Sequence, residues 1–118
     1  MTSPSQLKQI TPEIIKKYSN KSDVKALFQH VNTWVPYFLL FYVSLKSFQT
    51  QSYGLMLVSI LLLSLFIVRI FMLMHDCGHK SLFKTPLYNL IGGFFNGVFV
   101  GMPQYVWSQH HNYHHSTN

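Results

Sequence analysis

The sequence is poor in cysteine and in charged residues, and each shortage excludes a class of protein. One cysteine in 118 residues rules out a disulfide scaffold and any cysteine-based zinc site. Only 10% of the residues are charged, well below the roughly 25% of a soluble domain, and so few charges cannot cover a soluble surface. Hydrophobic residues make up 48%, which excludes a disordered chain. These proportions favour a small membrane protein or a piece of a larger one.

Acidic residues are scarce as well. Three Asp and Glu against nine Lys and Arg give a formal net charge of +6. Such a charge can indicate a nucleic-acid partner, but no basic face recurs along the chain, and we expect none. Five of the cations precede the first apolar run instead, namely Lys8, Lys16, Lys17, Lys21 and Lys25. In a membrane protein, such a cluster marks the cytosolic side.

The polar and basic segment 1–33 predicts cytosolic or interfacial helices. Thr11 followed by Pro12 is a typical helix start, and Ser22 can cap a second helix. After Ser22, apolar residues recur at helical spacing. The second helix can therefore lie on a membrane surface and lead into the membrane.

Two apolar runs follow, at residues 34–48 and 53–74, with a short polar turn between them. At 1.5 Å per residue the second run is roughly 33 Å long, enough for a hydrocarbon core of about 30 Å. Because the turn is short, the two runs must form an antiparallel transmembrane hairpin. The basic N-terminal segment then shares the cytosolic side with Lys80 and Lys84, which follow the second run. We therefore expect a multi-pass integral membrane protein.

A third apolar segment, residues 87–107, carries glycines at a spacing of four residues. Gly93, Gly97 and Gly101 would share one helix face, which allows close packing of another helix, although chance placement is an alternative. Pro103 disturbs the helix near its end. Hydropathy alone favours a simple third span. The other possibility is a broken path that enters the membrane and returns, or one that lies in the interface.

Histidine is the residue type that carries chemistry here, because six of the seven fall in two clusters. His75 and His79 are one helical turn apart, a spacing at which two imidazoles can bind one metal ion. In the second cluster, His111 shares a helix face with both His114 and His115. Histidine at a membrane border is costly unless it has a function, and imidazole suits zinc, copper, iron or nickel. The sequence therefore predicts a metal site with these five ligands.

The residues beside these histidines have supporting or alternative roles. His110 faces away from His114, so it can either bind the metal or contact a residue that binds it. Asp76 can orient a ligand histidine through a hydrogen bond, or it can be a solvated charge; Asn112 can play a similar part. Zinc proteolysis is disfavoured, because the glutamate that follows the first histidine of that motif is absent. The lone His30 is expected to be an ordinary core or interfacial residue.

Both clusters must reach one place to share a metal, and this constrains the fold. If residues 87–107 crossed the membrane fully, the second cluster would end on the opposite side from the first. We therefore predict an all-α membrane protein with N-terminal interfacial helices, a transmembrane helical hairpin, and a third apolar re-entrant or interfacial helical segment. Trp34 and Trp107 are expected to be anchors at the membrane interface.

The two clusters resemble the first two histidine boxes of membrane fatty acid desaturases, most closely those of the acyl-lipid branch. The first box reads HDCGHKSLF over residues 75–83. The second reads Trp107-x-x-x-His111-Asn112-x-His114-His115-x-Thr117-Asn118. The order of the boxes, their spacing and the hairpin before them agree with that family, and the resemblance covers essentially the whole chain.

The resemblance implies a membrane-bound, O2-dependent desaturase that introduces a double bond into an acyl chain with two iron ions. Its substrate would be a fatty-acyl lipid, and its electron donor would be of the ferredoxin or cytochrome b5 type. The iron ligands would be His75, His79, His111, His114 and His115. No catalytic residue beyond these ligands, and no other cofactor-binding residue, is implied.

The family also carries a third histidine box after two further spans, and residues 1–118 contain neither. We therefore expect this chain to be the N-terminal part of a desaturase domain and to be inactive by itself. A related membrane hydroxylase or carotenoid oxygenase uses similar boxes and is the alternative enzyme. An inactive, truncated metal-binding membrane protein is the alternative that is not an enzyme.

Overall fold

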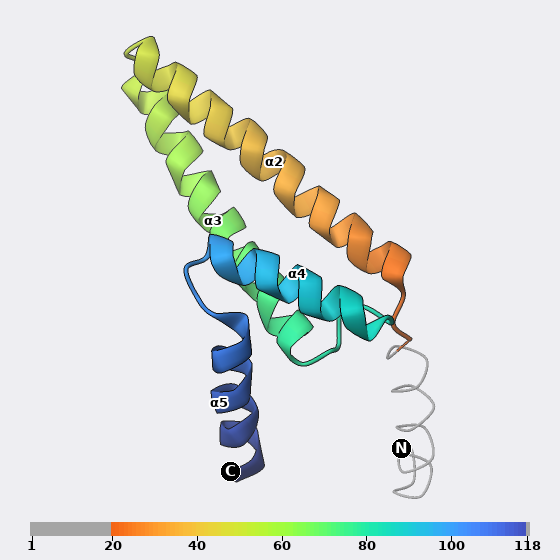
Figure 1. Cartoon of the computed structure of the whole chain (residues 1–118). Coiled ribbons are helices and arrows are strands. Elements are labelled where there is room, and N and C mark those ends of the chain that lie inside the picture. The colour runs from red at the N-terminus through yellow and green to blue at the C-terminus, as the bar shows by residue number, and fades with distance from the viewer. Residues whose placement is uncertain (1–19, 118) are drawn as a thin grey trace, which may run out of the picture.

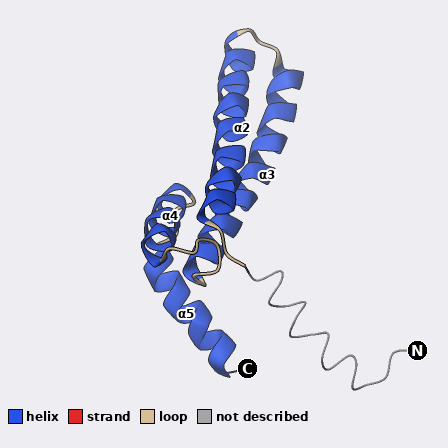
Figure 2. Ribbon diagram, turned by 90° about the vertical axis from the view of Figure 1, so that its right-hand side faces the viewer, coloured by secondary structure: helices blue, strands red, loops and turns tan. Residues whose placement is uncertain are grey.

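The computed structural model describes residues 20–117, which form four helices joined by short turns and loops (Figure 1). They are α2 (Asp23–Gln49), α3 (Tyr53–Gly78), α4 (Pro86–Phe99) and α5 (Gln104–Thr117). These described residues contain no strand, so the predicted all-α class is confirmed for them. The predicted helix start at Thr11 lies outside them. α2 and α3 form an antiparallel hairpin, α4 packs on α3, and α5 extends beyond the end of α3 (Figure 1, Figure 2).

α2 is one helix of 27 residues, which joins the predicted interfacial segment up to residue 33 to the predicted span 34–48. Its start is as predicted, because the Ser22 hydroxyl accepts the Lys25 backbone N–H at 3.5 Å. The helix continues through Asn32 and Thr33, which are poor helix formers rather than helix breakers and cost only about 0.7 kcal/mol each against alanine. The buried Thr33 hydroxyl donates to the Gln29 carbonyl within the helix (2.7 Å).

Among the described helices, α3 alone is long and apolar enough to cross a membrane. It contains the predicted run 53–74 and continues for one more turn through the first histidine cluster. The hairpin buries and exposes the opposite side chains from those of a soluble protein. Small polar side chains such as Ser47 and Ser59 are buried, while most of the large apolar side chains are exposed. Such a surface suits lipid or further protein better than water. That α2 also crosses the membrane remains a prediction.

The apolar segment predicted at residues 87–107 is two helices rather than one element. α4 ends at Phe99, and after a turn the chain begins α5 at Gln104. The 14 residues of α4 reach about 21 Å, too short for a hydrocarbon core of about 30 Å. A simple third span is therefore wrong for α4. The turn contains Gly101, whose φ of 70° lies in the left-handed region that favours glycine.

Two of the three regularly spaced glycines allow close packing, as predicted. A Cβ at Gly97 would lie 2.6 Å from the Met102 carbonyl oxygen, and a Cβ at Gly93 would lie 2.9 Å from the Gln104 side chain. These glycines thus let the chain fold back from α4 into α5. Gly101 is not on that face, because it forms the turn itself.

The C-terminal ends of α2, α3 and α4 share one hydrogen-bond pattern. In each, the residue after the C-cap has a positive φ: 57° at Gln51, 54° at Lys80 and 70° at Gly101. The next residue then donates its N–H to the carbonyl five residues before it, at 2.8 to 2.9 Å. Of the three residues, only Gly101 lacks the Cβ that makes this conformation unfavourable. At the end of α3, the pattern ends the helix at Gly78, with His79 as its C-cap.

A polar network joins α2 to α4. The Trp34 Nε1–H donates to Asn96 Oδ1 (3.2 Å), and the Asn96 amide donates to His30 Nε2 (3.0 Å). The other ring nitrogen, His30 Nδ1, donates to the Ala26 carbonyl (3.0 Å). A carbonyl only accepts and an amide nitrogen only donates, so these partners require the neutral Nδ1–H form of His30. His30 is thus the satisfied residue that the sequence predicts, but it holds two helices together.

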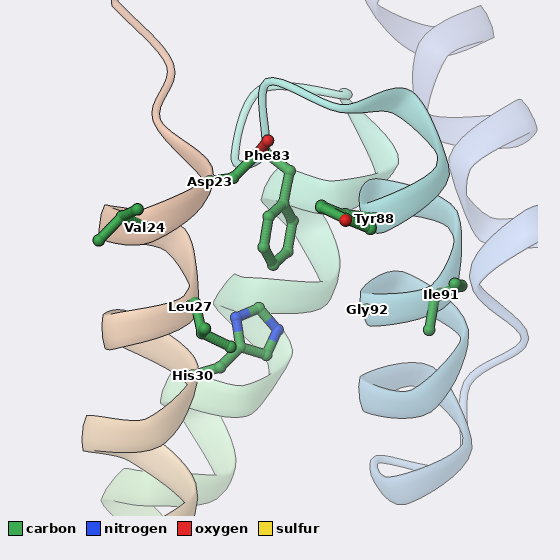
Figure 3. Close-up of a pocket in the computed structure, with 8 residues that line it drawn as sticks. All are labelled: Asp23, Val24, Leu27, His30, Phe83, Tyr88, Ile91 and Gly92. Atoms are coloured by element: carbon green, nitrogen blue, oxygen red, sulfur yellow. The ribbon is translucent and has the colours of Figure 1, made fainter.

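An apolar pocket of about 410 Å³ lies beside this network, between α2, α4 and the loop after α3 (Figure 3). The Phe83 ring packs over His30 with a centroid distance of 5.2 Å. Asp23 lies at the start of α2, and its carboxylate accepts the Thr85 hydroxyl (2.7 Å) and the Thr85 N–H (3.0 Å). These two hydrogen bonds lower the pKa of Asp23 from its ordinary value. They tie the start of α2 to the start of α4.

Candidate metal centre

Three histidines from the two clusters converge where α3 ends beside α5. The ring centroids of His75 and His79 are 4.6 Å apart, and His111 lies 5.1 Å and 4.9 Å from them. One ring nitrogen of each histidine lies within 4.8 Å of those of the other two. The sequence predicts that the two clusters share one place, and these three side chains do so.

The local sequence explains why the three rings meet. His75 and His79 are one turn apart at the end of α3, so they face the same side. After the turn at Gly101, α5 contacts α3 before it extends past the end of that helix (Figure 1). Gly78 then allows close contact, because a Cβ there would lie 3.2 Å from the Trp107 ring and 3.3 Å from the Ser108 Cβ. Glycine between the two histidines of box one thus gives α5 room, because a side chain there would have to displace Trp107 or Ser108 by a few tenths of an ångström.

Asp76 lies beside the first histidine, as its proposed orienting role requires. Its Oδ1 is 3.1 Å from His75 Nδ1, and both side chains are partly exposed, at 42% and 27%. An ionised carboxylate only accepts, so Nδ1 carries the proton, and in the neutral ring Nε2 then offers the lone pair that a metal needs. A pair this exposed adds little stability, and its effect is on the orientation of the ring.

The other sequence-predicted residues lie outside the three-histidine group or have side chains that the structure does not describe. His110 and His114 are exposed on α5 and are not part of the three-histidine group. The side chains of Asn112 and His115 are not described. The metal-binding roles of His114 and His115 thus stay predictions. α5 extends past the end of α3 (Figure 1).

The three imidazoles fit a transition-metal ion by donor type and by spacing. Nitrogens bound to one ion at about 2.1 Å, at tetrahedral or octahedral angles, lie about 3.0 to 3.4 Å apart, so nitrogens separated by up to 4.8 Å must close by as much as about 1.4 to 1.8 Å. Rotation of the rings about the Cβ–Cγ bond can supply that movement. Three neutral nitrogen ligands would leave coordination positions open for further ligands or for a substrate.

Comparison with known proteins agrees with this geometry. Residues 51–118, which contain α3, α4, α5 and both histidine boxes, match the family described as "Fatty acid desaturase". The chain belongs to the fatty acid desaturase family. A fatty acid desaturase of Bacillus subtilis (strain 168) is 35% identical over 111 residues, covering 94% of this chain and 31% of the relative. The chain thus spans about a third of the length of this relative. No solved structure matches.

Two side-chain contacts in this structure were not predicted from the sequence. The pairing of His30 with Asn96 joins residues 66 positions apart, and no local pattern reports such a contact. Trp107 was predicted as a membrane-interface anchor, but its ring stacks on His111. The spacing of four residues between Trp107 and His111 could have indicated this contact, because it puts both on one helix face.

Proposed function

We propose that this chain is part of an enzyme that desaturates fatty-acyl chains at a membrane, with iron held in part by His75, His79 and His111. The observation that carries the proposal is the convergence of these three rings from two helices. Membership of the desaturase family supports iron rather than zinc or copper. The exposed apolar hairpin supports an acyl chain in a membrane as the substrate.

Iron bound at such a centre supplies the O2-dependent oxidising power that an unactivated methylene requires. In the overall reaction O2 accepts four electrons and four protons and becomes two waters. Two electrons and two protons come from the two acyl C–H bonds. The other two electrons come from a donor of the ferredoxin or cytochrome b5 type, with two protons from solvent.

The chain's own residues contribute ligands and their orientation. His75, His79 and His111 offer neutral nitrogens, which hold a cation without adding negative charge beside an apolar substrate. Asp76 keeps Nε2 of His75 available. We assign His114 and His115 as further ligands and His110 and Asn112 as outer contacts. Two iron ions need more ligands than these, so residues 1–118 are proposed to be the N-terminal part of a longer desaturase domain.

We further propose that the α2–α3 hairpin spans the membrane and that both boxes face the cytosol with the lysine-rich N-terminal segment. α4 then lies in the interface, because it is too short to cross. Labelling of Ser81→Cys and Ser116→Cys in a Cys77→Ser background tests this arrangement. Both cysteines should react from the cytosolic side. Labelling from opposite sides would refute a shared site.

The activity is tested by expressing the protein that carries this sequence in a host without desaturases and analysing its lipids. We expect a new double bond, and we expect His75→Ala, His79→Ala and His111→Ala to abolish it at matched expression. His110→Ala is the matched control, because this exposed histidine lies outside the group and should retain more product. A hydroxylated acyl chain would favour the related hydroxylase instead. Full activity of His111→Ala would refute the proposed ligand set.

A further inference from the structure

We propose that Trp107 is a positioning residue of the metal centre, whose indole ring holds the imidazoles of His111 and His75 in the orientation that binds metal. The inference rests on the proposed metal centre and adds to it a residue that binds no metal. Trp107 precedes His111 by one turn of α5 and is half-buried between α5 and α3.

The contact with His111 is a face-to-face stack. The two ring centroids are 4.5 Å apart and the ring planes differ by only 16°. The lone pair of an imidazole lies in the plane of the ring, so the tilt of the ring decides where a metal can bind. Rotation of a histidine ring about Cβ–Cγ is otherwise loose. A parallel indole on one face restricts that rotation.

The same indole reaches across to α3. Its centroid lies 5.3 Å from the His75 ring at 57° and 5.9 Å from the Phe71 ring at 77°. These are distances at which aromatic rings attract each other beyond simple burial. Trp107 therefore contacts one proposed ligand from each histidine box, and it sets the separation between the boxes as well as the tilt of His111.

Trp107 is itself held in place by its surroundings. Gly78 leaves room for the edge of the indole, since a Cβ there would lie 3.2 Å from Trp107 Cζ3. The Phe71 ring of α3 packs edge to face against it. The chain's other tryptophan, Trp34, lies elsewhere, donates to Asn96 and packs on Phe99. The two tryptophans can therefore be changed separately, and Trp34 serves as the matched control.

The test measures Co²⁺ binding to the 118-residue chain in detergent, by titration and by the visible absorption spectrum of the bound ion. Co²⁺ is a suitable probe because its spectrum reports ligand geometry. Trp107→Leu should weaken binding by about ten-fold or more, the range seen when a residue that orients a ligand is removed, and should shift the spectrum. Trp107→Phe, which can still stack, should lie closer to the original chain. Trp34→Leu should leave both measurements unchanged.

A second variant covers the possibility that Trp107→Leu unfolds. Gly78→Ala keeps the indole but displaces it, and it should weaken Co²⁺ binding while helix content by circular dichroism is retained. Unchanged affinity and spectrum in Trp107→Leu, with loss in His111→Ala, would overturn the role of Trp107 and leave the metal centre intact. Equal binding by His111→Ala and the original chain would overturn both. Equal losses in Trp34→Leu and Trp107→Leu would overturn the positioning role by showing general destabilisation.

Discussion

Replacement of Asn96 by alanine should strongly destabilise the packing of α4 on the hairpin. Asn96 is fully buried and is the middle member of the network, accepting from Trp34 and donating to His30. Asn96→Ala leaves the indole N–H and the His30 Nε2 without these partners. At about 1 to 3 kcal/mol for each unsatisfied buried group, the loss is at most about 6 kcal/mol.

The lower limit comes from hydrogen bonds between membrane helices, which average about 0.6 kcal/mol, so two such bonds give about 1 kcal/mol. Both hydrogen bonds of Asn96 are only part-buried, so the groups left behind do not pay the full penalty of a buried group. We therefore expect a loss of about 2 to 3 kcal/mol in the free energy of unfolding. Equilibrium unfolding in detergent, followed by circular dichroism, measures it.

The control is Asn32→Ala, which removes an exposed asparagine from α2 and should change the stability by less than about 0.5 kcal/mol. His30→Ala combined with Asn96→Ala should cost less than the sum of the single variants, because both break the same hydrogen bond. An Asn96→Ala variant as stable as Asn32→Ala would show that the network contributes nothing, and the reasoning would be wrong.

Three further predictions concern the helix ends and the α4–α5 turn. Lys80→Gly should stabilise the chain by about 1 kcal/mol, seen as a higher melting temperature, since glycine relieves the left-handed strain at φ 54°; a lower melting temperature would contradict this. The pKa of Asp23 is lowered, so its hydrogen bonds to Thr85 should stabilise the chain fully at a pH above the ordinary pKa of 3.8. This stabilisation should be lost as the pH falls through the lower pKa of the folded state. The stability difference between the original chain and Asp23→Ala should accordingly shrink in acid, and a constant difference would refute the assignment. Gly97→Ala should cost about 1 to 3 kcal/mol in unfolding titrations, because its Cβ would meet the Met102 carbonyl at 2.6 Å; a neutral result would show that the turn can move.

The sequence predicted those features that depend on local pattern. Ser22 as a helix cap is visible from the residue type, and the pairing of His75 with His79 follows from helical spacing alone. The meeting of the two boxes was also predictable, because a shared metal excludes a full crossing between them.

Features decided by packing rather than by local pattern were predicted only in part. The continuity of α2 past residue 33 depends on tertiary packing of a stretch whose local helix propensity is weak. A break in residues 87–107 was expected from Pro103, but its position between Phe99 and Gln104 also involves the close approach of Gly97 to Met102, which hydropathy does not report. The stacking of Trp107 likewise depends on the space left by Gly78 on another helix.

The buried hydroxyls of the hairpin have a consequence for how its two arms evolve and move. Thr33 donates to the carbonyl of Gln29 and Ser59 donates to that of Leu55 (2.8 Å), so each hydroxyl is saturated within its own helix. No hydrogen bond of these two groups is broken when one arm slides along the other. Each of these two positions therefore requires a small side chain, not a particular hydrogen bond. We expect relatives to exchange serine, threonine, alanine and glycine there and to exclude larger residues.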